Sequence, residues 1–219
     1  MSKPPSSIPS SAPALWQQLG ATAQALQAVR AGHSSSTALA AVPASLRPGV
    51  QALLFQVLRQ LGRAQALRQQ LAPRTPPPAL DALLCTALAL AWDEASAPYA
   101  PFTLVNQAVE AAKRGPMARQ AGFVNACLRR FLREREALLA TVEADPVASS
   151  NHPAWWLQRL RQDWPTQWQA IVAANQQHAP MALRVNLQKT TLAQYQQALA
   201  AMNLIADTVG DCGLLLRQP

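Results

Sequence analysis

The sequence predicts a mainly α-helical protein, in which an all-α bundle is followed by the beginning of a small α+β domain. Three observations predict this class. Half of the 219 residues are apolar, which is enough to form a sizeable core, and only 14% are charged. Apolar residues recur three and four positions apart in segments of helix length, and Pro and Gly separate these segments. Between residues 14 and 139, no segment alternates as a strand does.

The helices of the bundle begin after a Ser/Pro-rich tail, residues 1–13, which is expected to be disordered. The first helix ends near Gly32, and the serines that follow can cap the second helix. A proline-rich breaker, residues 73–78, ends the fourth helix. The predicted helices cover residues 15–30, 36–42, 48–61, 64–71, 80–92, 102–113 and 117–132.

The segment 80–92 is apolar on nearly every side, which predicts that it is the central helix of the bundle. The segment 48–61, in contrast, is apolar on one face only. The segments 102–113 and 117–132 are joined at Gly115-Pro116 and are expected to be the last two helices of a bundle of about 125 residues.

After Asp145-Pro146 the sequence changes character. Trp155, Trp156, Trp164 and Trp168 fall in two short predicted helices, and they are expected to form a small core. A strand at 181–187, a helix at 192–202 and short strands at 204–209 and 213–216 follow. We therefore expect three parts, which are a tail at 1–13, an all-α domain at 14–145 and an incomplete α+β domain at 146–219 that is cut at Pro219.

The chain is basic, with 19 Lys and Arg against 11 Asp and Glu, a formal charge of +8 and a pI near 10.4. Such a balance indicates a polyanionic partner, either nucleic acid or an acidic membrane surface. The N-terminus lacks the apolar segment of a signal peptide, and the stretch 80–92 contains Asp81 and is too short to span a bilayer. Cys85 and Cys127 lie in apolar helical patterns and are expected to be core residues without disulfides. We expect a cytoplasmic protein without a membrane partner.

Basic residues are concentrated between Lys113 and Arg135, where seven cations face a single acid, Glu134. On a helical wheel Arg119, Arg130 and Arg133 project within about 60° of one another, with Arg129 adjacent. The opposite face is apolar, so one face is expected to pack on the bundle while the other offers arginines to phosphate oxygens. The predicted nucleic-acid contacts, here called the basic strip, are Lys113, Arg114, Arg119, Arg129, Arg130 and Arg133.

A solvated helix face is the alternative interpretation of the basic strip, and the number of nearly unopposed cations favours nucleic-acid contact. Phe123 lies on the basic side, where it can stack on an unpaired base, but packing against a neighbouring helix is the favoured interpretation. Arg135 falls on the apolar side and is expected to lie beyond the packed part.

The usual catalytic constellations are missing. The sequence has no GxGxxG and no GxxxxGK[ST], and His33, His152 and His178 are too dispersed to form a ligand set. Asp93 and Glu94 are interpreted as a solvated helix end. By itself this chain is therefore expected to hold no catalytic residue, no cofactor and no metal ion.

Two motifs carry a family resemblance. The stretch NQAVEAAKR at 106–114, followed by GFVNACLR at 122–129, resembles the paired signature of NusB-like domains, which are all-helical RNA-binding modules. The stretches HPAWWL at 152–157 and PMALRVN at 180–186 resemble the region that joins such a domain to the catalytic half of bacterial small-subunit rRNA cytosine-C5 methyltransferases of the Sun/RsmB type. Together they cover roughly residues 15–209.

The resemblance implies that a further domain follows in members of that family. This domain binds S-adenosylmethionine and contains a Gly-rich loop and two catalytic cysteines. None of the three cysteines of this chain lies in those motifs. Members also often carry arginines in the first helix for RNA contact, whereas here that helix holds only Arg30. The implied function is therefore to position small-subunit rRNA for methylation by a catalytic domain. Two alternatives stay open, which are a free-standing transcription antitermination factor that acts through a protein partner and a structural domain whose basic face is incidental.

Overall fold

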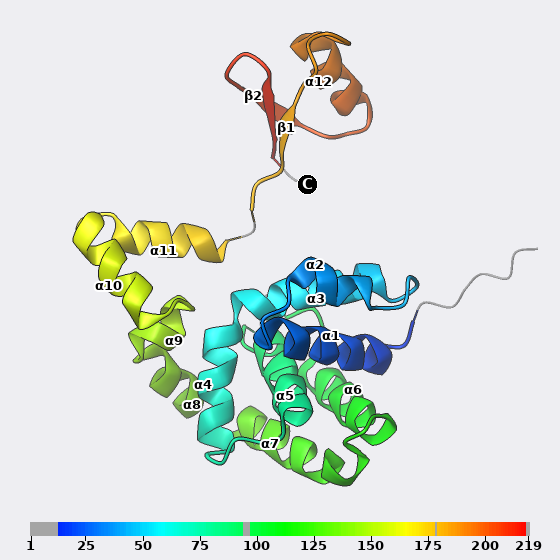
Figure 1. Cartoon of the computed structure of the whole chain (residues 1–219), viewed down its shortest axis with the longest axis vertical. Coiled ribbons are helices and arrows are strands. Elements are labelled where there is room, and N and C mark those ends of the chain that lie inside the picture. Colours follow the sequence, from blue (N-terminus) through cyan, green and yellow to red (C-terminus); the bar gives the residue numbers. More distant parts are fainter. Residues whose placement is uncertain (1–12, 94–96, 178, 218–219) are drawn as a thin grey trace, which may run out of the picture. The chain divides into compact units, whose positions relative to one another are not determined.

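The first part of the chain folds as a bundle of helices (Figure 1). The computed structural model describes residues 13–93, 97–177 and 179–217. The expected disordered tail lies outside these residues except for Pro13, whose carbonyl accepts a hydrogen bond from Gln18 Nε2 at 2.9 Å. The bundle contains α1 (Leu15–Arg30), α2 (Ser35–Ala40), α3 (Arg47–Arg59), α4 (Leu61–Leu71), α5 (Pro78–Leu90), α6 (Pro101–Arg114), the 3₁₀ helix η1 (Ala118–Gln120), α7 (Ala121–Arg133), α8 (Arg135–Glu143) and α9 (Pro146–Ser150).

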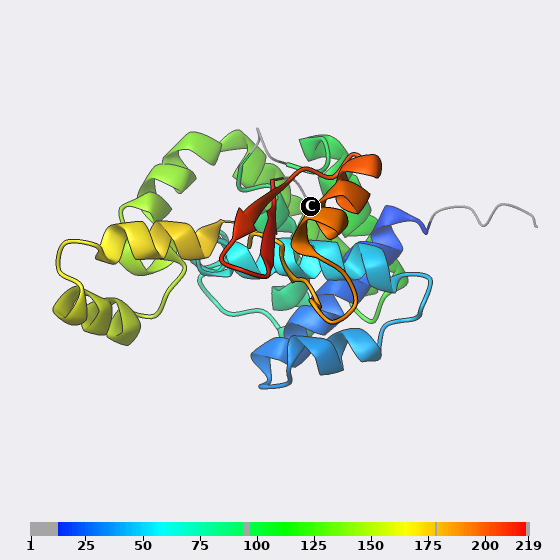
Figure 2. The same cartoon turned by 90° about the horizontal axis from the view of Figure 1, so that it is seen from above.

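Helix α5 is the centre of this bundle, as its all-round apolar sequence predicts. Every residue from Leu80 to Leu90 is buried. Helices α1, α3, α4, α6 and α7 all pack against α5. Helices α1, α2 and α3 also contact one another and lie together, blue to cyan, in Figure 2. The predicted bundle fold is therefore confirmed, and Cys85 and Cys127 are buried in its core as expected.

The local signals in the sequence explain where several helices begin. The Ser34 hydroxyl accepts a hydrogen bond from the Thr37 amide at 3.0 Å and caps α2, as the run of serines predicts. Helices α3, α5 and α6 each have Pro in their first turn, where the missing N–H costs no helical hydrogen bond. These caps place the helix starts within a few residues of the predicted ones.

The bundle continues beyond the helix that the sequence marks as its last. Helices α8 and α9 both pack on α4, and they add Leu138, Val142 and Ala148 to the same buried core. The expectation that the segment 117–132 is the final helix of the bundle is therefore wrong. It fails because α8 and α9 are short and each buries only one or two apolar residues, too few for a clear periodic pattern.

Asn151 fastens the end of α9 to the junction between α3 and α4. Its side-chain oxygen accepts a hydrogen bond from the Gly62 amide at 2.5 Å, and its side-chain NH₂ donates to the Leu58 carbonyl at 3.0 Å. Asn151 itself adopts a left-handed conformation with φ of 55°, which Asn tolerates better than most residues. A Cβ at Gly62 would lie 3.0 Å from Asn151 Oδ1 and 3.2 Å from its Cα. This junction therefore requires glycine at position 62.

Replacing Gly62 with alanine is expected to lower the free energy of unfolding by about 1–3 kcal/mol, because the added methyl group forces Asn151 away. Gly122→Ala in α7 is the matched control, since nothing lies within 4 Å of its added Cβ. That substitution is expected to raise stability by about 0.5–1 kcal/mol. Urea unfolding followed by circular dichroism measures both, and equal effects of the two changes would contradict the proposed crowding.

The C-terminal part is a small α+β unit. Residues from Gln169 onward form a compact unit separate from residues up to Trp168. The stretch between the bundle and the sheet holds α10 (Ala154–Asp163) and α11 (Trp168–Gln176). The sheet contains β1 (Ala182–Arg184), β2 (Ala206–Val209) and β3 (Gly213–Leu216), with α12 (Leu192–Ala201) between β1 and β2.

This sheet is antiparallel in the order β1-β3-β2. Ala182 pairs with Leu215, and Ala206 pairs with Leu216. Its small core consists of Val185, Leu199, Ala206, Leu214 and Leu216. The strands and helix predicted for this region are confirmed. Within the described residues, the structure has no helix long and apolar enough to cross a membrane.

Candidate nucleic-acid interface

The structure exposes the basic strip along the end of α6, through η1 and over one side of α7. All six side chains of the strip are exposed. The opposite side of α7 is buried in the bundle, as the sequence predicts, and it contributes Ala121, Val124, Cys127, Leu128 and Phe131 to the core. The strip is therefore held on the outside of the bundle in part by the packing of α7, which carries half of its residues.

Four of the six cations are held by neighbouring side chains. Arg114 forms an ion pair with Glu110, and its guanidinium lies 4.8 Å from the centre of the Trp16 ring. Arg129 Nε donates to Asn125 Oδ1 at 3.1 Å. Lys113 and Arg119 make no ion pair with any residue that the structure describes. The strip thus combines oriented guanidinium groups with two cations that form no ion pair with a described carboxylate.

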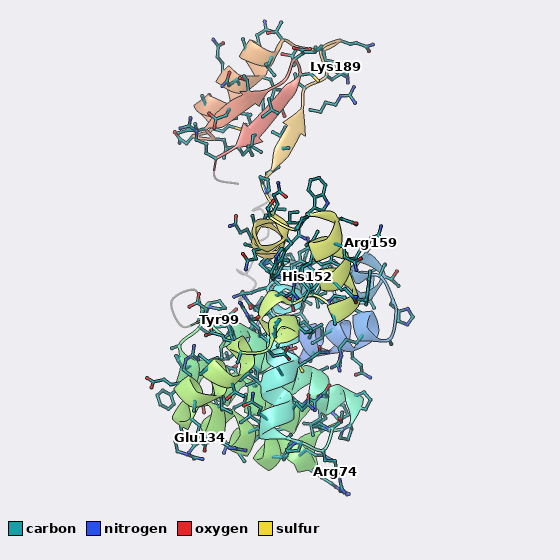
Figure 3. All side chains as sticks on the ribbon, turned by 90° about the vertical axis from the view of Figure 1, so that its left-hand side faces the viewer. Arg74, Tyr99, Glu134, His152, Arg159 and Lys189 are labelled. Carbon is teal, nitrogen blue, oxygen red and sulfur yellow. The ribbon has the colours of Figure 1, made fainter. Side chains whose placement is uncertain are left out.

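Glu134 bridges two arginines of the strip and lies at the outer edge of the bundle (Figure 3). Arg130 Nε donates to its Oε2 and Arg133 Nη2 to its Oε1, both at 2.8 Å. These two hydrogen bonds, that of Arg130 first, hold the pKa of Glu134 below its usual value, as a bond from Arg114 does for Glu110. With Glu110 and Glu134 ionised, the six cations leave the strip a formal charge of +4.

Arg135, the seventh cation of the run, has a structural role. Its guanidinium donates to the backbone carbonyls of Ala91 at 2.7 Å and Trp92 at 2.6 Å, and it lies 5.2 Å from the centre of the Phe131 ring. These contacts satisfy carbonyl groups at the C-terminal end of α5. The expectation that Arg135 lies beyond the packed part is therefore wrong, because its apolar-side position points it at this helix end.

Two aromatic expectations are also wrong. Phe123 is 41% exposed on the same side as the basic strip and is not packed away against a neighbouring helix. The tryptophan group does not form one small core, because Trp155 is 68% and Trp164 is 53% exposed. Trp156 instead stacks on His152 at 4.3 Å, and the Arg161 guanidinium covers the Trp168 ring at 4.2 Å. The helices are amphipathic, but too little of the chain packs on their outer sides to cover every ring.

Asp81 is a buried charge whose partners the sequence analysis did not find. Its carboxylate is 2% exposed and lies 2.6 Å from Arg30 Nη1 and 2.6 Å from Arg68 Nε. The Arg30 contact is a hydrogen bond, whereas Arg68 Nε is not aligned for one and the attraction there is electrostatic. Arg30, the one arginine of the first helix, is thus held by a buried carboxylate. A single acid inside an apolar run was the available signal.

The buried thiols are unsuited to nucleophilic chemistry. Burial, followed by the nearby Asp81 carboxylate, raises the pKa of Cys85 to about 12, and burial also raises the pKa of Cys127. Among the described residues, no three His, Cys, Asp or Glu side chains lie together where they could hold a metal ion. Glu94 and His178 lie outside the described residues. What the described surface offers is an exposed basic helix face suited to binding.

The fold thus defines a two-part protein, in which an all-helical bundle with a basic face is followed by a small α+β unit. Residues 18–133 match the NusB family, and the chain belongs to that family. Residues 152–219 match the ferredoxin-like domain described as Methyltr_RsmF/B-like. The resemblance that the sequence motifs indicate is therefore confirmed.

Similar proteins extend over both parts of the chain. A protein of Vibrio cholerae named ribosomal RNA small subunit methyltransferase B is 37% identical, over 84% of this chain and 44% of its own length. The protein of that name from Pasteurella multocida is 32% identical, over 89% of this chain and 44% of its own length. The chain thus spans less than half the length of these relatives. The crystal structure of PH0851 shares the fold, with a TM-score of 0.62 at 15% identity over 97% of this chain and 49% of that one.

Proposed function

We propose that this chain is the RNA-binding N-terminal region of an S-adenosylmethionine-dependent rRNA cytosine-C5 methyltransferase, and that it positions small-subunit rRNA for methylation. The observation that carries this proposal is an exposed basic strip on a NusB-family bundle that is followed by a methyltransferase-associated ferredoxin-like domain. We assign the helical bundle through α9 to the RNA-binding domain, which extends the expected limit at residue 145, and the compact unit from Gln169 onward to the second domain. We place the protein in the cytoplasm, where its RNA substrate is found.

In this proposal the basic strip acts by charge and shape. Arginine forks match the geometry of phosphate oxygens, and folded RNA presents its phosphates at a spacing that reflects its shape more than its sequence. Contacts of this kind fix the orientation of an RNA without reading its bases. The methyl transfer and the S-adenosylmethionine site are assigned to the part of the relatives that lies outside the matched region.

A free-standing antitermination factor with a protein partner is the other function that the sequence left open. It is less well supported, because an antitermination factor of this kind needs no ferredoxin-like domain, whereas residues 152–219 match one. The relatives that align over both parts are also named as methyltransferases.

A salt titration tests the proposal. A fluorescently labelled small-subunit rRNA hairpin is titrated with this chain at several salt concentrations, and binding is measured by anisotropy. Six phosphate contacts predict that the logarithm of the binding constant falls against the logarithm of salt with a slope of about −4 to −5. A DNA hairpin of the same sequence controls for general polyanion binding. A slope no steeper than about −1, or the absence of binding, would overturn the proposed RNA contact.

A further inference from the structure

Helix α10 presents a second surface that the basic strip does not explain. Trp155, which is 68% exposed, lies three residues before Gln158 and seven before Gln162, so the three side chains share one side of the helix. Both glutamines are exposed, and neither side-chain amide hydrogen-bonds to another described residue. An exposed indole thus stands beside two amide groups whose donors and acceptors are available to a ligand.

A groove of about 310 Å³ runs between α9 and α10 beside this surface. Its floor is apolar, formed in part by Val147 and the buried Leu157. The polar side chains that line it are Gln158, Arg161 and Gln162. Arg161 lies 4.2 Å over the Trp168 ring, a contact that restrains its guanidinium. The groove therefore combines an apolar floor with amide and guanidinium groups on its polar side.

This combination matches a nucleobase. A base has two apolar faces, which stack on aromatic side chains, and a polar edge, which exchanges hydrogen bonds with amides. Stacking on an exposed tryptophan does not depend on which base is present, whereas the glutamine amides can favour one edge pattern over another. A base in a duplex keeps both faces covered by its neighbours, so only an unpaired base fits.

The exposed side of α10 favours RNA over a protein partner. That side holds the exposed indole of Trp155 together with the exposed side chains of Gln158, Arg159 and Gln162. Arg159 forms an ion pair with Asp163 at 2.8 Å and lies on the outer side of the helix (Figure 3). A single exposed aromatic ring among polar and cationic groups is typical of single-strand RNA binding, whereas a protein interface needs a contiguous apolar centre.

We infer that the side of α10 bounded by Trp155, Gln158, Arg161 and Gln162 binds an unpaired nucleotide of the RNA. The inference rests on the proposed function, because it adds a base contact to an RNA that the basic strip holds by its phosphates. Trp155 stacks on the base, the two amides meet its edge in the groove, and Arg161 meets the adjoining phosphate. The α10 surface thereby selects RNA with an unpaired base next to a folded element.

The test compares two RNAs and three proteins. The first RNA is a small-subunit rRNA hairpin with 2-aminopurine at an unpaired loop position, and the second is a fully paired duplex of the same length. The proteins are this chain, Trp155→Ala, and Trp155→Phe, which keeps an aromatic ring. Trp155→Ala is expected to weaken hairpin binding about tenfold and to remove the quenching of 2-aminopurine, while duplex binding stays unchanged. Trp155→Phe is expected to retain hairpin binding within about threefold.

A variant in which both Gln158 and Gln162 are changed to alanine tests the contribution of the groove independently of the contribution of the indole. It is expected to keep the quenching and to reduce the preference among loop bases. If the unchanged chain binds the hairpin with a steep salt slope but Trp155→Ala binds equally well, the inference is overturned, the proposed function stands, and the surface is open to a protein partner. If the unchanged chain binds neither RNA, both the inference about α10 and the proposed function are overturned.

Discussion

Changing Arg119, Arg130 and Arg133 together to glutamate is expected to weaken binding of a small-subunit rRNA hairpin by about a thousandfold. Three charged hydrogen-bond contacts at about 1.5 kcal/mol each correspond to a loss of that size. The salt slope is expected to become shallower by about 2–3, because three phosphate contacts are removed. Anisotropy titrations at several salt concentrations measure both effects, and circular dichroism checks that the bundle remains folded.

Arg135→Gln is the matched control for this variant. It removes a cation from the same run, but one whose guanidinium donates to the carbonyls of Ala91 and Trp92. RNA affinity is expected to stay within about threefold, while the free energy of unfolding falls by about 2–3 kcal/mol through the loss of two charged hydrogen bonds. A loss of RNA affinity in Arg135→Gln as large as that of the triple variant would mean that binding is not governed by the basic strip alone.

Replacing Asp81 with asparagine is expected to lower the free energy of unfolding by about 3–5 kcal/mol. The change removes the carboxylate that Arg30 and Arg68 share, and it leaves the Arg68 guanidinium, whose side chain is 11% exposed, without its counter-charge. Three helices meet at this carboxylate, since Arg30 ends α1, Arg68 lies in α4 and Asp81 lies in the first turn of α5. Urea unfolding followed by circular dichroism measures the effect.

Two further variants define what the Asp81 result means. Glu136→Gln removes an exposed carboxylate from the first turn of α8 and is expected to change stability by no more than about 0.5 kcal/mol. Replacing Arg30, Arg68 and Asp81 together with Met, Met and Leu is expected to restore most of the stability, because apolar groups of similar volume can replace a buried ion cluster. If Asp81→Asn alone proves as mild as Glu136→Gln, the cluster does not hold the three helices together.

The positions of most helices along the chain could be predicted from the sequence because the signals for them are local. The apolar run of α5, the serines before α2 and the prolines in the first turns each act through neighbouring residues. The exposure of the basic strip was likewise predictable, since the apolar and basic sides of α7 alternate with the helical period. The RNA-binding role of its six residues is a prediction that the titrations above test.

The contacts that could not be predicted join residues far apart in the chain. Nothing near Asp81 in the sequence indicates Arg30 or Arg68 as its partner. Nothing near Arg135 indicates that it donates to two carbonyls just after the end of α5. The contact between Gly62 and Asn151 is likewise visible only in the folded structure. The exposure of Trp155 was missed for the opposite reason, because a periodic pattern shows which residues share a helix side but not whether another element covers that side.

The shared carboxylate of Glu134 gives the basic strip a built-in competitor. Because Arg130 and Arg133 already hold an anion, a phosphate arriving there exchanges one negative partner for another and does not occupy a vacant cation. The net gain in binding free energy from each such contact is therefore smaller than for an arginine without a carboxylate partner. An isolated phosphate at this position gains little binding free energy. A ligand that also contacts Lys113 and Arg119 gains more binding free energy. This difference favours an extended, shaped polyanion, and the competing carboxylate makes that ligand easy to release.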